Sequence, residues 1–223
     1  MKSALPPPSS IVCVDNNIVF KAVYNPNSIV IELFDKLILE RSCILYSTEA
    51  NLRRCQEAVE RKILHLVEKL LRKRDPRVEH VRQFSFIMDA LEIAKGKIRK
   101  GKKLKELNQN EAFKTFTDEL IDYVRNFVLQ RFDFIKSFLE LKDFAFYKAK
   151  FEDAVSILRD KEPDNEDANI LALALTLHEQ ENKPVYLWTD DNDFYEVEQI
   201  LKGYGVIPFK RVEGIELDSL MDV

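Results

Sequence analysis

Short apolar runs alternate with longer amphipathic stretches in the first 60 residues of the chain. Residues 11–14 and 43–46 are apolar runs of strand length, rich in β-branched side chains. Between them, the apolar positions of residues 29–40 fall at helical spacing, and Ser47 or Thr48 is placed to cap a helix that starts near Glu49. The pattern predicts a β-α-β-α beginning.

The same alternation returns near the C-terminal end of the chain. We expect a helix over residues 167–179, a strand over 185–188, a short helix over 194–201 and a strand over 206–209. Strands that alternate with helices favour a parallel sheet covered by helices. The two ends together therefore predict an α/β fold with a central parallel sheet flanked by helices.

The middle of the chain has a different pattern. It is helical and basic over residues 49–73 and 76–95, is interrupted by two glycines among the positive charges of 95–103, and becomes helical again over 111–158. Nine of the fifteen phenylalanines lie between residues 113 and 151, as in the core of a helical hairpin or small bundle. We therefore expect a discontinuous α/β domain, residues 1–59 and 159–223, with a helical insertion at 60–158.

The distribution of charge adds a candidate partner. Residues 60–106 hold 15 Lys and Arg against 7 Asp and Glu, although the whole chain has a net charge of −4. Such a region could be a solvated helix face, but positive charge beside an acidic site is also what holds a phosphate backbone. The nucleic-acid-binding candidates are Arg53, Arg54, Lys97, Arg99, Lys100, Lys102 and Lys103.

Compartment and membrane association can also be predicted from composition. No apolar run approaches the length of about 20 residues that a membrane span requires, and the first ten residues lack the apolar segment of a signal peptide. Cys13, Cys43 and Cys55 are odd in number and have no metal-binding spacing, so we interpret them as core residues in a reducing compartment. We expect a cytoplasmic protein with no membrane contact.

Carboxylates gather where the predicted strands end. Asp15 follows the first strand, Asp190, Asp191 and Asp193 follow the strand at 185–188, and Asp167 stands at the start of the helix between them. The carboxyl ends of parallel strands share one edge of a sheet, so these acids should converge there. Hard oxygen ligands without histidine or cysteine suit Mg²⁺ or Mn²⁺.

Three blocks of this sequence resemble the motifs of PIN-domain nucleases. They are VDNNIV at residues 14–19, EDANILALAL at 166–175 and LWTDDNDF at 187–194, and they occur in the order that the family has. The resemblance covers about the first 55 and the last 65 residues. It implies a metallonuclease that uses Mg²⁺ or Mn²⁺ to cleave phosphodiester bonds of RNA, with single-stranded DNA as the alternative substrate.

The resemblance also implies roles for individual residues. The family's helix after the second strand usually supplies an acid, but Arg53 and Arg54 occupy its expected place, so Glu49, or else Glu57, would supply it. The implied catalytic residues are Asp15, Glu49, Asp167 and Asp191, the metal ligands are these four with Asp193, and the supporting residues are Asn17, Glu166, Thr189 and Asp190.

Other interpretations remain open at this point. Any one of the acids could be a turn or helix-capping residue, because carboxylates at a helix N-terminus are stabilising. The chain could be a non-catalytic scaffold or an RNA-binding module with the same fold, a homodimer, or a protein that binds a partner through the helical insertion. A toxin of a toxin–antitoxin pair fits less well, because such nucleases are usually compact. The sequence leaves open which nucleic acid is cut, and whether cleavage is endo- or exonucleolytic.

Overall fold

The computed structural model describes residues 5–24, 29–72, 109–159 and 165–210 of the 223-residue chain. They divide into two compact units. The sheet unit consists of Met1–Ala22, Asn27–Cys55 and Lys136–Val223, and the helical unit consists of Val23–Pro26 and Gln56–Ile135. No helix in the described ranges combines the length and the apolar character that a bilayer crossing requires.

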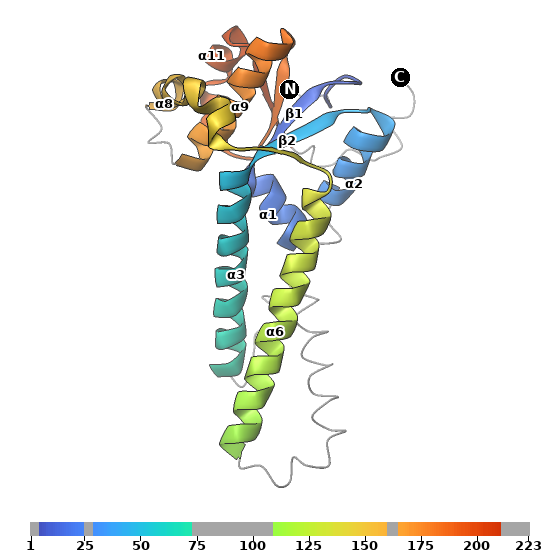
Figure 1. Cartoon of the computed structure of the whole chain (residues 1–223), viewed down its shortest axis with the longest axis vertical. Coiled ribbons are helices and arrows are strands. Elements are labelled where there is room, and N and C mark those ends of the chain that lie inside the picture. Colours follow the sequence, from blue (N-terminus) through green and yellow to red (C-terminus); the bar gives the residue numbers. More distant parts are fainter. Residues whose placement is uncertain (1–4, 25–28, 73–108, 160–164, 211–223) are drawn as a thin grey trace. The chain divides into compact units, whose positions relative to one another are not determined.

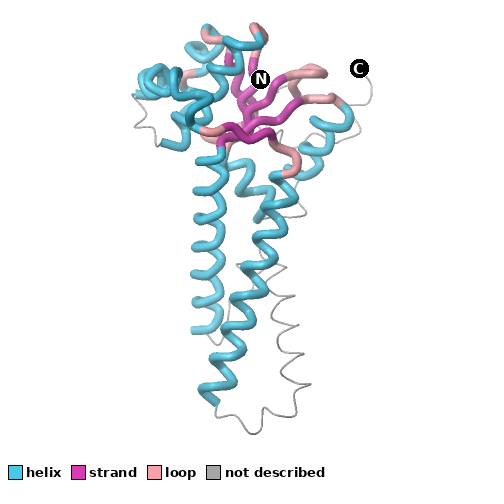
Figure 2. The backbone as a smooth tube through the Cα atoms, in the orientation of Figure 1, coloured by secondary structure: helices cyan, strands magenta, loops and turns pink. Residues whose placement is uncertain are grey.

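The sheet unit contains a five-stranded sheet in which every neighbouring pair is parallel, so the predicted α/β fold is confirmed. Figure 2 shows the strands of this sheet in magenta. The strand order is β3-β2-β1-β4-β5, which places β1 at the centre. All four residues of β1 are buried, as expected for a strand covered on both faces. The strands are β1 Ile11–Val14, β2 Ile44–Thr48, β3 Glu140–Lys142, β4 Val185–Trp188 and β5 Val206–Phe209.

One strand corrects the prediction. Residues 111–158 were expected to be helical throughout, but they contain β3, which pairs with β2 at one edge of the sheet. The sequence of β3 is Glu-Leu-Lys, too short and too polar to show a strand pattern. The compact helical unit ends at Ile135, and the insertion bounds of residues 60–158 stay a prediction.

Helical segments of different lengths lie between the strands along the chain (Figure 1). The helix predicted over residues 29–40 changes to a π-helical segment after Asp35, and the helix α1, directly after β1, was not predicted. The helical segments are α1 Asn16–Tyr24, α2 Ile29–Asp35, η1 Lys36–Glu40, α7 Phe144–Tyr147, η3 Lys148–Lys150, α8 Phe151–Leu158, α9 Asn165–Glu181, α10 Asn192–Glu196 and α11 Glu198–Gly203.

The helix α9 covers one face of the sheet. Its residues from Ala168 to Leu177 are buried all round, the pattern of a helix enclosed by other elements. It contacts β1, β2 and β4 and shares one apolar core with side chains such as Cys13 and Leu187. This packing fixes the N-terminus of α9, with Glu166 and Asp167, relative to the ends of the central strands.

On the opposite face, the sheet is contacted by Phe34 of α2. Successive side chains of a strand point to opposite faces, so Trp188 lies on the other side of the sheet from Leu187. The Trp188 ring lies 5.1 Å from the ring of Phe34 in α2 and stacks at 5.9 Å on Phe209 of β5. Pro208 in β5 is tolerated because β5 is an edge strand. Both faces of the central strands are therefore buried from water, and the polar groups lie at the ends of the strands.

The helical unit contains most of α3, which spans Glu49–Arg72, and most of α6, which spans Gln109–Lys136. Its buried apolar residues include Val59, Val128 and Phe132. The basic candidates Lys97, Arg99, Lys100, Lys102 and Lys103 and the helix predicted over 76–95 lie outside the described residues.

Candidate functional site

The strand order determines where a ligand site is expected. From β1 the chain adds β2 and β3 on one side, then crosses to add β4 and β5 on the other side of β1. In open parallel sheets, ligands bind outside the carboxyl ends of the strands where the order reverses in this way. That point lies between β1 and β4, where Asp15 and Thr189 are the first residues after each strand.

Asp15 is the most enclosed carboxylate of this edge, with only 2% of its surface exposed. One carboxylate oxygen accepts a hydrogen bond from the Asn16 backbone N–H at 2.6 Å. The other accepts from Asn17 Nδ2 at 2.8 Å and from Thr189 Oγ1 at 2.6 Å. Buried charge is tolerated when hydrogen bonds satisfy it, and these three donors hold the Asp15 carboxylate in one orientation.

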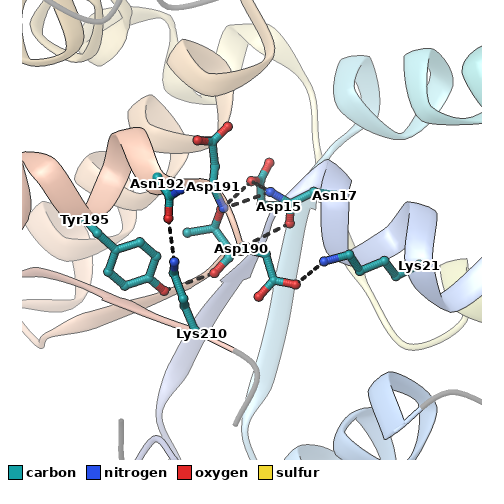
Figure 3. A network of polar contacts seen from close by, with 9 residues as sticks. Asp15, Asn17, Lys21, Asp190, Asp191, Asn192, Tyr195 and Lys210 are labelled. Carbon is teal, nitrogen blue, oxygen red and sulfur yellow. Dashed lines mark hydrogen bonds and ion pairs between the residues drawn. The ribbon is translucent and has the colours of Figure 1, made fainter. Parts of the chain in front are cut away.

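Thr189 joins Asp15 to the loop after β4. Its hydroxyl accepts hydrogen bonds from the Asp191 backbone N–H at 3.0 Å and from Asn17 Nδ2 at 3.1 Å. The Asp191 side chain accepts from the Asp193 backbone N–H at 3.0 Å and so caps α10. The predicted residues Asp15, Asn17, Thr189 and Asp191 are therefore brought together (Figure 3).

Two lysines lie close to these carboxylates. Lys21 of α1 forms an ion pair with Asp190. Lys210, the first residue after β5, donates to Asn192 Oδ1 at 2.6 Å and lies 4.5 Å from the centre of the Tyr195 ring. In Figure 3 the two ammonium groups stand on either side of the aspartates. Neither lysine was predicted as a site residue, because a single lysine in a helix or after a strand has no distinctive sequence pattern.

Tyr195 of α10 holds the loop after β4 through a hydrogen bond to its backbone. Burial, together with the nearby charge of Asp190, raises the pKa of Tyr195 well above its ordinary value. The phenol therefore stays protonated and donates a hydrogen bond of 3.0 Å to the backbone oxygen of Thr189.

A second group of polar residues surrounds Glu166 in the first turn of α9. One carboxylate oxygen accepts a hydrogen bond from Asn16 Nδ2 at 2.7 Å, and the other lies 3.4 Å from Arg54 Nη1. The backbone oxygen of Glu166 accepts from Asn51 Nδ2 at 3.0 Å. Because Asn16 is next to Asp15 in the chain, the two polar groups are continuous.

Asn51 and Asn16 were also missed by sequence reasoning. Asn16 lies beside the predicted Asp15. Asn51 lies in the first turn of α3, where its backbone N–H donates to the capping hydroxyl of Thr48 at 3.0 Å, and its side chain is fully buried. The available signal was an amide three residues after a capping Thr, on the same helix face as the apolar Cys55. The sequence prediction instead looked for an acidic side chain in this helix, at Glu49 or Glu57.

The predicted acids of α3 are placed elsewhere. Glu49 is exposed, and its charge is among those that raise the pKa of Tyr147. Glu57 is exposed and belongs to the helical unit. Arg53 is exposed, whereas Arg54 reaches Glu166. A metal-binding role for Glu49 stays a prediction.

A metal requires more oxygen ligands than the acids supply together. Within the described ranges, no three Asp, Glu, His or Cys side chains form a group that could hold an ion. Asp167 and Asp193 are partly buried in the first turns of their helices, α9 and α10. Neutral oxygens are present, however, because the buried Oδ1 atoms of Asn16 and Asn51 accept no hydrogen bond. Carboxylates with neutral oxygens and retained water are what Mg²⁺ accepts, so the residues fit such an ion.

The negative potential of the site reaches a neighbouring thiol. Burial raises the pKa of Cys55 far above its ordinary value, and the charges of Glu166 and Asp15 raise it further. The Cys55 sulfur also lies 3.7 Å from the backbone oxygen of Asn16. The thiol is therefore an inert core group, as the sequence predicted.

Comparison with known proteins gave no match, whether to family models, to curated proteins or to solved structures.

Proposed function

We propose that this chain is a divalent-metal-dependent nuclease that hydrolyses phosphodiester bonds of RNA, with single-stranded DNA as the alternative substrate. The proposal rests on the three sequence blocks that resemble PIN-domain nucleases, and on the position of the residues in them. Asp15, Asp167 and Asp191 all stand at the carboxyl edge of the parallel sheet or at the helix N-terminus beside it.

A single observation carries most of the argument. Asp15 is 2% exposed, is aligned by three hydrogen-bond donors, and lies between β1 and β4 where the strand order reverses. A carboxylate needed only to begin α1 could remain in solvent, and the protein would then avoid the free-energy cost of burying a charge. A buried and aligned carboxylate at a ligand-binding edge is better explained by a role in holding an ion.

In this proposal some residues of the site hold the metal ion and others position the ligands. Asp15, Asp167 and Asp191 would hold Mg²⁺ or Mn²⁺, and Thr189 keeps Asp15 and the start of the Asp191 loop at a fixed separation. The ion would lower the pKa of the attacking water and offset charge on the phosphate. Glu166 and Asn17 act as supporting residues, because they hold their neighbours in place through hydrogen bonds.

Positive charges would hold the substrate against this acidic edge. Arg53 and Arg54 are exposed on the first turns of α3, and Lys21 and Lys210 border the aspartates. Phosphate contacts of this kind supply affinity that does not depend on sequence and that falls as salt rises.

The test is a cleavage assay with labelled RNA and labelled single-stranded DNA in Mn²⁺. Asp191→Asn keeps the α10 cap and the shape of the side chain, so the fold should be retained while cleavage falls roughly a hundredfold. Asp153→Asn is the matched control, because it removes an exposed acid of α8 that pairs only with Lys150. Full activity in Asp191→Asn would exclude this site.

A non-catalytic nucleic-acid-binding module is the second candidate. It is favoured by the cations that already neutralise two of the acids, Lys21 at Asp190 and Arg54 at Glu166. On this hypothesis the wild type binds RNA in EDTA and in Mn²⁺ equally well and cleaves it in neither. Asp191→Asn would then leave binding and RNA integrity unchanged.

A further inference from the structure

Two buried amide oxygens on residues that contact Glu166 accept no hydrogen bond from the described part of the chain. They are the Oδ1 atoms of Asn51 and Asn16. Buried polar atoms almost always have partners, and an unsatisfied one costs about 1–3 kcal/mol. Both atoms belong to residues that donate to Glu166, Asn16 to its carboxylate and Asn51 to its backbone oxygen, so the two amides lie around one residue.

The orientation of both amides follows from the chemistry of their partners. Asn51 Nδ2 faces a backbone carbonyl oxygen of Glu166, and Asn16 Nδ2 faces its carboxylate. Both partners can only accept hydrogen bonds, so the amide nitrogen must face them and the oxygen must be the free end. Rotating either amide would bring two acceptors together.

The free ends therefore need a positively polarised partner. A cation suits this need, because Asn16 donates to the carboxylates of both Asp15 and Glu166, and Asn51 donates to the backbone oxygen of Glu166. Amide carbonyl oxygens are ordinary ligands of hard divalent ions. The shortage of grouped acids at this edge is then made up by neutral ligands.

We propose that Asn51 and Asn16 are neutral oxygen ligands of a divalent cation that binds beside Glu166. This inference rests on the metal-dependent function proposed above, and it adds two ligands to which the resemblance assigns no role, Asn16 inside the first sequence block and Asn51 outside all three. Since an amide carries no charge, the ion should be held more weakly than by a full set of carboxylates and should exchange readily.

The test measures Mn²⁺ binding to the full chain without nucleic acid, by the loss of the free-ion signal in electron paramagnetic resonance. Asn51→Leu and Asn16→Leu keep the side-chain size and remove the oxygen, and each should weaken binding about tenfold or more. Asn51→Asp should tighten binding, and its melting temperature should rise more with Mn²⁺ than that of the wild type.

Asn165→Asp is the matched control. It adds the same charge one residue before Glu166, at an exposed position, and its Mn²⁺ affinity should stay close to that of the wild type. Thermal melts identify any variant that fails to fold, and the two asparagines give independent measurements. An equal gain in Asn165→Asp and Asn51→Asp would overturn the proposal by showing that only general charge matters.

Two other outcomes separate this inference from the proposed function. Unchanged affinity in both leucine variants, or no binding by the wild type, overturns the inference and assigns the free oxygens to a bound water only. Altered affinity without any cleavage by the wild type supports the metal ligands and removes the nuclease. Cleavage that depends on Asp191, with Mn²⁺ affinity insensitive to Asn51 and Asn16, leaves the nuclease and removes the ligands.

Discussion

The hydroxyl of Thr189 should be the most sensitive single group of the candidate site, and Thr189→Val tests it. The hydroxyl donates to the buried Asp15 carboxylate at 2.6 Å and accepts from the Asp191 backbone N–H at 3.0 Å and from Asn17 Nδ2 at 3.1 Å. Valine has the same shape but can form none of these bonds. The change therefore removes the hydrogen bonds without opening a large cavity.

The expected loss can be worked out from these contacts. A hydrogen bond to a charged group contributes about 1.5–3 kcal/mol, and leaving a buried N–H unsatisfied costs a similar amount. Because the bonds share one atom they are not additive, and we expect a loss of about 2–4 kcal/mol. For a chain of this size that corresponds to a fall of about 4–16 °C in melting temperature.

Urea unfolding followed by tryptophan fluorescence is a suitable assay. The chain has one tryptophan, Trp188, which is fully buried and directly precedes Thr189, so its emission reports on the sheet unit. Thr176→Val is the matched control, because the buried Thr176 hydroxyl only donates to the Ala172 carbonyl of its own helix. That variant should lie within about 1 kcal/mol of the wild type. Equal stability of the two variants would refute the role assigned to Thr189.

Three further predictions concern other parts of the sheet unit. Gly205→Ala should lower the free energy of unfolding in urea by roughly 2–4 kcal/mol, because Gly205 has φ +72° and a Cβ there would lie 2.2 Å from the His178 imidazole of α9. The control is Gly203→Ala, whose Cβ meets no described atom within 4 Å and which should leave the stability unchanged. Burial raises the pKa of Cys55, so the thiol stays protonated at pH 8 and a disulfide reagent should label it only after unfolding; fast labelling of the native protein would contradict this. Arg54→Gln should tighten Mn²⁺ binding, because Arg54 competes for the carboxylate that it contacts, while Arg53→Gln removes an exposed charge without that contact and should change the affinity less.

The fold was predictable wherever burial left a regular pattern. The runs at residues 11–14 and 185–188 are apolar because they lie in the middle of the sheet, and both were predicted with their bounds. The strand β3 was not predictable, because an edge strand of three residues has one neighbour and an exposed face, so its side chains follow no buried pattern. The helix α1 was missed for a related reason: it follows β1 after a single residue, with no turn signal.

The candidate site was predictable on its acidic side. Asp15, Thr189 and Asp191 follow apolar strands directly, so the rule that parallel strands end at one edge was enough to bring them together. Asn51 and Lys21 could not be found in that way. Their importance depends on which helix face contacts the edge, and that is decided by the packing of α1, α3 and α9 more than by the local sequence.

The distribution of charge around Asp15 bears on how the protein behaves without metal. Asp190 is paired with Lys21 and Glu166 with Arg54, so the acids of this edge do not depend on an ion for neutralisation. Asp15 itself is held by neutral and backbone donors. A chelator should therefore remove the proposed activity and lower the melting temperature only by the amount that ion binding adds, in contrast to proteins that unfold without their metal. The ion would then serve the chemistry of the site alone, and the hydrogen bonds of Thr189 and Asn17 would keep the site ready to receive it.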